Sequence, residues 1–138
     1  MDKKLLDLAI KAALHSADTV LSKRELTINR DQGKDIKLQA DLESEKVILS
    51  YLKSSGINIL SEESGFTRVS TNSEYIWIID PLDGSLNYSR NIPLSCISIA
   101  LWFQEEPVMG VVYDFERKRV YSGVVGEGAF VDNTKIKV

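Results

Sequence analysis

Two aspartates, Asp80 and Asp83, stand directly after an apolar run at residues 75–79. A continuous apolar run between polar segments is typical of a strand that is buried on both faces. Two carboxylates held close together in a partly buried place repel each other, and a divalent cation relieves that repulsion. Because the donors are oxygen atoms only, the pattern favours Mg²⁺ or Mn²⁺ over zinc. The sequence therefore predicts a hard-metal site at the end of this strand.

The residues between and after the two aspartates predict an anion site beside the metal. Pro81 fixes its own φ and stiffens the turn between the acids, and Gly84 permits a φ that other residues resist. We expect Ser85 to cap a short helix whose first backbone N–H groups bind phosphate. The alternative interpretation is an ordinary turn, because Asp, Pro and Gly are all common turn formers. The spacing fits poorly with phosphatases that form an aspartyl-phosphate, in which the second Asp follows two residues after the first.

The stretch from Trp77 to Tyr88 resembles the signature of the inositol monophosphatase family, in a superfamily with fructose bisphosphatases and bisphosphate nucleotidases. The family pattern is a tryptophan, two aliphatic residues, Asp-Pro, an aliphatic residue, Asp-Gly-Thr/Ser, and then Asn and an aromatic residue. Every position of that pattern is met here, and the similarity extends over nearly the whole chain. The resemblance implies hydrolysis of a small phosphate monoester, of a phosphorylated alcohol or sugar, by metal-activated water. It implies Mg²⁺ as the cofactor, with Mn²⁺ as an alternative.

The resemblance also implies roles for individual residues. The residues implied as metal ligands are Glu62, Asp80, Leu82 (through its backbone carbonyl) and Asp83. The residues implied in catalysis are Asp41, Glu62 and Ser85. The residues implied in phosphate binding are Gly84 and Ser85. Glu63 is implied as a neighbour that supports Glu62 without contacting the metal.

Several features depart from the family pattern. Ser61 stands where the family has the glycine of its Gly-Glu-Glu segment, and Leu38 and Ala40 replace the threonines of its Thr-x-Thr-Asp segment. Family members are about twice as long, and their second half supplies a further Asp ligand in a Trp-Asp segment. Neither tryptophan of this chain is followed by Asp. We therefore expect residues 1–138 to form one domain, the amino-terminal metal-site half of such a fold, with the carboxy-terminal half absent and activity incomplete.

The remaining sequence predicts the elements that position these residues. Helical periodicity covers residues 3–21, and a second helix is expected over residues 42–54, with Asp41 as its N-cap and Gly56 as its terminator. The polar segments that predict loops are 29–37 and 65–74. The β-prone segments are 26–28, 57–60, 75–79, 96–103, 108–113 and 120–122. This order predicts an α+β fold, with two helices packed on a mostly antiparallel sheet. The family resemblance implies that it is the amino-terminal half of a layered αβαβα sugar-phosphatase fold.

Composition and charge argue against several classes of protein. Of 138 residues, 43% are hydrophobic and 27% are charged, which is typical of a soluble globular domain. The 17 basic and 20 acidic residues give a net charge of -3, so no basic excess is available for binding nucleic acid. No apolar run approaches the roughly 20 residues needed to cross a bilayer. The single cysteine, Cys96, favours a cytoplasmic compartment, and we interpret it as a packing residue, because no histidine follows it.

Two other functions remain open on the sequence. One is a related activity of the same superfamily, a 3′(2′),5′-bisphosphate nucleotidase or a sugar bisphosphatase. The other is a non-catalytic metal-binding or assembly domain. We also expect a homo-oligomer, because half of a layered fold exposes a sheet face or edge that another copy can cover.

Overall fold

The computed structural model describes the backbone of residues 3–23 and 30–138 and the side chains of residues 3–23 and 39–138. The helical elements are α1 (Lys3–Thr19), η1 (Leu21–Lys23), α2 (Arg30–Leu52), η2 (Lys53–Ser55) and α3 (Ser85–Ser89). The first four strands are β1 (Asn58–Ser61), β2 (Gly65–Thr67), β3 (Tyr75–Asp83) and β4 (Cys96–Phe103). The last four strands are β5 (Glu106–Asp114), β6 (Arg119–Val124), β7 (Gly128–Val131) and β8 (Thr134–Ile136). None of the described helices is long and apolar enough to cross a membrane.

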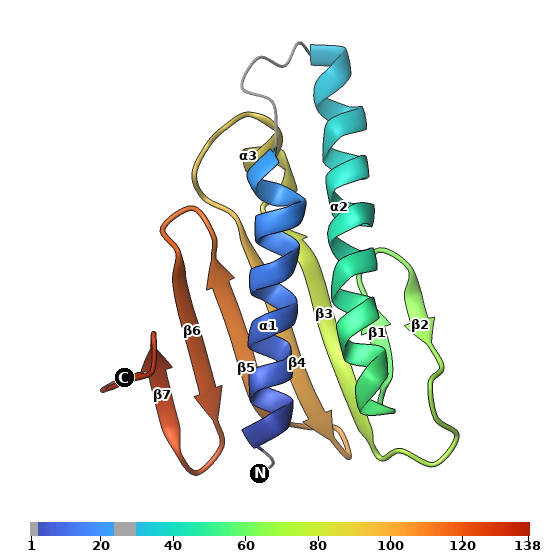
Figure 1. Ribbon diagram of the computed structural model, residues 1–138, viewed down its shortest axis with the longest axis vertical. Coiled ribbons are helices and arrows are strands. Elements are labelled where there is room, and N and C mark those ends of the chain that lie inside the picture. Colours follow the sequence, from blue (N-terminus) through green and yellow to red (C-terminus); the bar gives the residue numbers. More distant parts are fainter. Residues whose placement is uncertain (1–2, 24–29) are drawn as a thin grey trace.

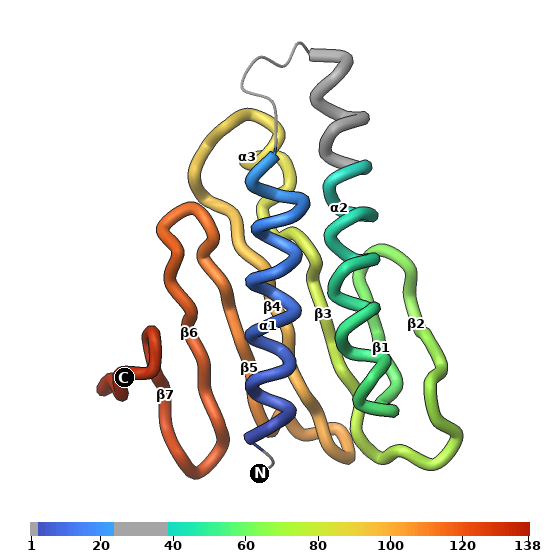
Figure 2. Tube along the Cα trace, viewed as in Figure 1, coloured from blue at the N-terminus to red at the C-terminus, as the bar shows by residue number. Residues whose placement is uncertain are grey.

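The strands form one sheet in the order β2-β1-β3-β4-β5-β6-β7-β8. β1 and β3 pair in parallel, and all the other neighbouring strands pair antiparallel. Helices α1 and α2 run antiparallel to each other across one face of the sheet (Figures 1 and 2). The expected α+β fold, two helices on a mostly antiparallel sheet, is confirmed.

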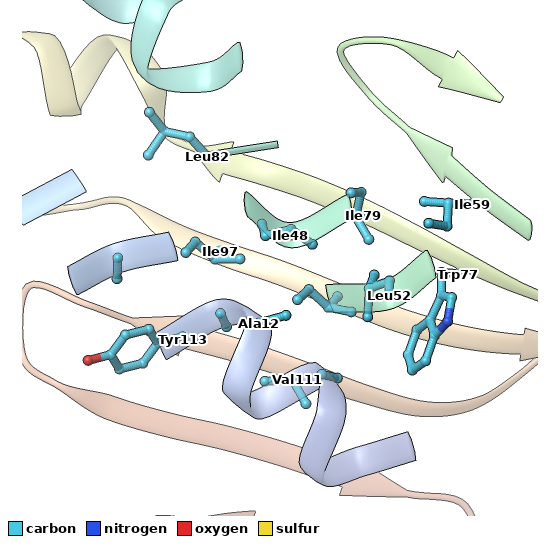
Figure 3. Close-up of a cluster of buried hydrophobic side chains, with 14 of the residues drawn as sticks. Ala12, Ile48, Leu52, Ile59, Trp77, Ile79, Leu82, Ile97, Val111 and Tyr113 are labelled. Atoms are coloured by element: carbon cyan, nitrogen blue, oxygen red, sulfur yellow. The ribbon is translucent and has the colours of Figure 1, made fainter. Parts of the chain in front are cut away.

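The hydrophobic core fills the space between the helices and the face of the sheet that they cover, which is called here the covered face (Figure 3). Alternate residues of the central strands point into it, and in β4 these are Ile97, Ile99 and Leu101. Helix α1 meets the sheet through buried alanines, whose small side chains let the helix approach closely. Trp77 of β3 is completely buried, and its indole N–H donates to Ser55 Oγ at 3.0 Å. This core anchors β3, the strand that carries Asp80 and Asp83.

The second helix begins earlier than the sequence suggested. The loop expected over residues 29–37 was wrong from Arg30 onward, because α2 starts there and runs without a break to Leu52. Asp41 is therefore an interior residue of α2 and not its N-cap. Polarity misled the prediction, since Lys, Gln and Arg are good helix formers and a single Gly33 costs only about 1 kcal/mol. Gly56 does end the helical segment, with a φ of 73° and its N–H bonded to Lys53 O.

The strands also differ from expectation at several points. The loop expected over residues 65–74 was wrong at its start, where β2 occupies Gly65–Thr67. β3 extends beyond the predicted residue 79 to Asp83, and its pairing with β4 shifts by one residue between Asp80 and Asp83. A proline inside a strand is tolerated at such a bulge, which explains how β3 accommodates Pro81. The strands β7 and β8 were not predicted, and the β-prone stretch at 26–28 lies outside the described residues.

Candidate functional site

Glu62 and Asp80 are brought together by the parallel pairing of β1 and β3. Ser61, the last residue of β1, pairs with Ile79 of β3, so the next residue on each strand is an acid. The backbone N–H of Glu62 donates to Ile79 O at 3.2 Å, which continues the pairing one step beyond β1. Figure 1 shows the two strands running in the same direction, with β3 continuing beyond the end of β1 toward α3. Two carboxylates that are far apart in the sequence therefore share one edge.

The environment of Asp80 shows the electrostatic consequence of this pairing. Burial raises the pKa of Asp80 to about 7, and a hydrogen bond with Glu62, the negative charge of Glu62 and that of Asp83 act in the same direction. The backbone N–H of Leu82, 3.2 Å from Asp80 Oδ1, acts in the opposite direction. Full ionisation of Asp80 is therefore unfavourable at neutral pH unless a cation compensates its charge.

Asp83 lies on the far side of the bulge, opposite Cys96 of β4. The Cys96 thiol lies 3.9 Å from Asp83 Oδ2. Burial and the charges of Asp83, Asp80 and Asp114 raise the pKa of Cys96 to about 11, so the thiol stays protonated and is a poor nucleophile. Cys96 is a free cysteine and is only partly buried.

Gly84 and Ser85 form the start of α3. Gly84 has a φ of 81° and is the N-cap of this helix, so the expectation that Ser85 caps it was wrong. A Cβ at position 84 would lie 2.5 Å from Leu94 O, so only glycine fits. The Ser85 hydroxyl instead lies 3.0 Å from Asp41 Oδ1 and 2.9 Å from Leu82 O, and it can donate to either. The structure thus joins two of the expected catalytic residues, Asp41 and Ser85.

Three buried polar residues of α2 face the acidic turns, and they are called here the α2 polar face: Asp41, Ser44 and Glu45. The spacing of i, i+3 and i+4 places them on one side of the helix. Ser44 Oγ donates to Pro81 O at 2.7 Å, and Glu45 Oε2 accepts a hydrogen bond of 2.6 Å from Ser61 Oγ. Ser44 and Glu45 were not among the site residues that the sequence predicted. The signal was their helical spacing from Asp41, which the mistaken helix start concealed.

The acids do not form a ready-made metal cluster. Among the described residues, no three His, Cys, Asp or Glu side chains are grouped closely enough to hold a metal ion as they stand. Glu62 is exposed and Glu63 partly buried in the turn after β1. The Leu82 carbonyl is close to the Ser85 hydroxyl. The structure therefore brings together Glu62 with Asp80, and Asp41 with Ser85 and Leu82.

A cavity of about 470 Å³ adjoins the site. It includes Asp83 and Gly84, and it extends over side chains of β5 and β6 that point away from α1 and α2. Its polar lining residues are Asp83, Asn87, Ser95, Cys96, Asp114, Arg117 and Tyr121. Arg117 Nη1 forms an ion pair with Asp114 at 3.1 Å and also donates to Pro93 O. The cavity is thus lined by both polar and apolar residues, and it adjoins the turn that carries Asp83.

Comparison with known proteins gives the chain its family. The model of the inositol monophosphatase family matches residues 1–138. The chain belongs to this family. It is 36% identical over 132 residues to a fructose-1,6-bisphosphatase of Pyrococcus furiosus, covering 86% of this chain and 51% of that protein. It is 35% identical over 144 aligned residues to the Nus factor SuhB of Xylella fastidiosa, covering all of this chain and 51% of that protein.

A solved structure gives the same result for the fold. The inositol monophosphatase from Anabaena (Nostoc) superposes with a TM-score of 0.82 at 36% identity, covering 99% of this chain and 50% of that one. The chain spans about half the length of the curated relatives it matches.

Proposed function

We propose that this chain supplies the metal-binding half of a phosphatase that hydrolyses a small phosphate monoester, such as an inositol monophosphate. The observation that carries the proposal is the placement of Glu62 and Asp80 side by side at the ends of two parallel strands, with Asp83 and Ser85 just beyond. Membership of a family whose members include named phosphatases supports it. Because the relatives are about twice as long, activity of residues 1–138 alone is expected to be low or incomplete.

The proposed metal ligands are Glu62, Asp80, the Leu82 carbonyl and Asp83. Their donors are all oxygen atoms, which suits Mg²⁺ or Mn²⁺. The crowding of Asp80 by neighbouring carboxylates fits such a cation, because its charge would offset their repulsion. When bound, a divalent cation activates water and neutralises charge on the phosphate. Glu63 is proposed to support Glu62 from the adjacent position.

Asp41 and Ser85 are proposed to orient the attacking water. The Asp41 carboxylate lies within hydrogen-bond distance of the Ser85 hydroxyl, so that hydroxyl can donate to Asp41 while its lone pair accepts from water. Gly84 and Ser85 are proposed to contact the phosphate through their backbone. Inside α3 the first bond runs from Tyr88 N–H to Gly84 O, so the preceding N–H groups need partners outside the helix.

A second polypeptide region is proposed to complete the site. On the face of the sheet away from α1 and α2, called here the open face, Leu60, Val112 and Tyr121 are 40–42% exposed. We propose that a region equivalent to the unmatched half of the relatives packs on this face and forms the opposite wall of the cavity. The alcohol part of the substrate would then lie between Asp83 and that wall. A homo-oligomer and a cytoplasmic location, expected from the sequence, remain predictions.

A sugar bisphosphatase is the second candidate, because the relative from Pyrococcus furiosus carries the name fructose-1,6-bisphosphatase. A bisphosphate nucleotidase remains the other enzymatic alternative from the sequence. A non-catalytic metal-binding or assembly domain is the candidate of another class. The relative that matches the whole chain and is named a Nus factor supports keeping that alternative.

The test is phosphate release and metal binding by the same samples. Inositol 1-phosphate, fructose 1,6-bisphosphate and 3′-phosphoadenosine 5′-phosphate would be supplied with and without Mg²⁺ to this chain and to Asp83→Asn. Release that needs both Mg²⁺ and Asp83 would support the phosphatase, and the preferred substrate would separate the enzymatic candidates. Metal binding without release would favour an incomplete site or the assembly domain. Release that persists in Asp83→Asn at equal Mg²⁺ would contradict the proposed ligands.

A further inference from the structure

The turn that carries Glu62, residues 62–64 between β1 and β2, is held from one side by a single carboxylate. Glu45 lies in α2 with 5% of its surface exposed. Its Oε2 accepts from Ser61 Oγ at 2.6 Å and from the backbone N–H of Ser64 at 3.1 Å. Ser61 and Ser64 flank Glu62 and Glu63, so one oxygen atom binds both ends of the segment that presents Glu62.

Burying a carboxylate is energetically unfavourable, so a purely structural role explains Glu45 poorly. Removing such a group from water costs free energy that hydrogen bonds must offset, and an apolar residue of similar size often serves stability as well or better. The two donors that offset this cost for Glu45 both belong to the 61–64 segment. Its contacts therefore act on the position of that segment rather than on the core.

Without this clamp the position of Glu62 would be weakly fixed. Glu62 is exposed at the tip of a turn, and its N–H bond to Ile79 O is one of the contacts that tie it to β3. Ser61 is also where this chain differs from the glycine of the family pattern, and its hydroxyl is the donor that Glu45 binds. If Glu62 and Asp80 bind one cation together, free movement of the backbone at Glu62 would weaken the binding of that cation.

We propose that Glu45 is a positioning residue, which clamps the 61–64 segment through Ser61 and Ser64 and so holds Glu62 beside Asp80. Glu45 belongs to the α2 polar face, in which Asp41 accepts a hydrogen bond from Ser85 and Ser44 donates one to Pro81 O. One helix face thereby fixes the two acidic turns relative to each other. The inference rests on the proposed function for its metal readout, and it is tested separately by a readout that needs no metal.

Three substitutions in α2 separate the effect of Glu45 on the position of the 61–64 segment from the effect of its negative charge. Glu45→Met removes the acceptor and keeps the length and helix propensity of the side chain, whereas Glu45→Gln keeps an oxygen that can accept both hydrogen bonds. Glu43→Met is the matched control, because Glu43 is exposed, binds Gln39 Nε2 at 2.9 Å and carries the same charge two residues away. Ser61→Ala removes the hydroxyl donor on the opposite side, should Glu45→Met fold poorly.

The first readout is binding of Mn²⁺ alone to the 138-residue chain, followed by electron paramagnetic resonance. Glu45→Met should weaken binding about tenfold and Ser61→Ala about threefold, while Glu45→Gln and Glu43→Met stay within about twofold of the parent chain. Glu45→Met leaves the buried Ser61 hydroxyl without its acceptor, so the midpoint of thermal unfolding without metal should fall. A single cooperative thermal transition, as in the parent chain, separates the effect on Mn²⁺ from a loss of fold. Equal Mn²⁺ affinity in the parent, Glu45→Met and Ser61→Ala would overturn the proposal.

The second readout is hydrogen exchange of the Ser64 amide in the absence of metal. Exchange should be at least about tenfold faster in Glu45→Met and unchanged in Glu43→Met. If the parent chain binds no Mn²⁺, the proposed metal function fails, and this exchange measurement then decides the inference alone. Faster Ser64 exchange in Glu45→Met would still support the clamp, and unchanged exchange would overturn it.

Discussion

The two faces of the sheet differ in how completely their polar groups are satisfied. On the side covered by the helices, Asp41, Ser44 and Glu45 of α2 are buried, and they form hydrogen bonds with Ser85, Pro81 and Ser61. On the cavity side, Ser95 Oγ is buried and finds no hydrogen-bond partner among the described residues. A buried polar atom without a partner is rare in finished interiors. The difference between the two sides thus rests on Ser95, whose hydroxyl is where a molecule that enters the cavity could add a hydrogen bond.

The largest expected difference between the faces is in stability. Trp77→Ala should lower the free energy of unfolding by about 3–5 kcal/mol, because it empties a fully buried site and removes the bond to Ser55. Tyr121→Ala, on the open face, should cost less than about 1 kcal/mol. Urea unfolding of both variants measures the two values. Equal losses would show that the open face is as tightly packed in solution as the covered one.

The second difference is in metal affinity. Asp80→Asn should weaken Mn²⁺ binding about a hundredfold, since loss of even an indirect partner of a metal ligand costs tenfold or more. Its unfolding free energy should stay level or rise, because the fold already favours the neutral form of Asp80.

Asp114→Asn is the control from the cavity side, where Asp114 is paired with Arg117. It removes one negative charge without touching the proposed ligands, so Mn²⁺ affinity should change less than about threefold. Titration of both variants at one ionic strength gives the comparison. A larger effect for Asp114→Asn than for Asp80→Asn would contradict Asp80 as a ligand and place the cation nearer to Asp114.

The sequence predicted the strand that carries the acids better than the helix that packs beside it. The strand at 75–79 and the acids after it were predicted because a continuous apolar run and a specific motif act locally. The second helix was expected over residues 42–54, but its start at Arg30 could not be placed, because residues 30–35 are polar whether they form a helix or a loop. Ser44 and Glu45 have the types of ordinary exposed helix residues, and only the tertiary fold turns them toward Pro81 and Ser61. Ser85 was expected to cap α3, but the N-cap is Gly84, because that position has a positive φ that favours glycine.

The third expected effect is a pH dependence of the acidic edge. A cation needs the ionised form of Asp80, whose pKa is raised to about 7, so Mn²⁺ affinity should fall by up to about tenfold per pH unit below that value. Without metal, the quantity that depends on pH is the stability of the fold, and it changes in the opposite direction. The raised pKa favours folding while Asp80 is protonated, so its contribution is complete below about pH 4 and is lost as pH rises through 7. Mn²⁺ titrations and thermal unfolding between pH 5 and pH 8 measure both trends. Affinity that is independent of pH across this range would contradict a role for Asp80 as a ligand.

The smallest and most local test uses two neighbouring valines of β5. Val111 is 1% exposed on the covered face and Val112 is 40% exposed on the open face. Val111→Thr buries a hydroxyl of nearly the same volume as a methyl group and should cost about 1–2 kcal/mol. Val112→Thr exposes that hydroxyl to water and should change stability by less than about 0.5 kcal/mol. Because the two positions share one strand, backbone propensity is matched and only the face differs.

The same pair tests whether the open face is free in solution. If Val112→Thr costs as much as Val111→Thr and its cost grows with protein concentration, a second copy covers the open face, as the expected homo-oligomer requires. A small cost at every concentration, with a monomer in sedimentation, would leave this face free. The region equivalent to the relatives' second half is then the better candidate to cover it, since that region would contact Val112 and the Ser95 hydroxyl in the same cavity.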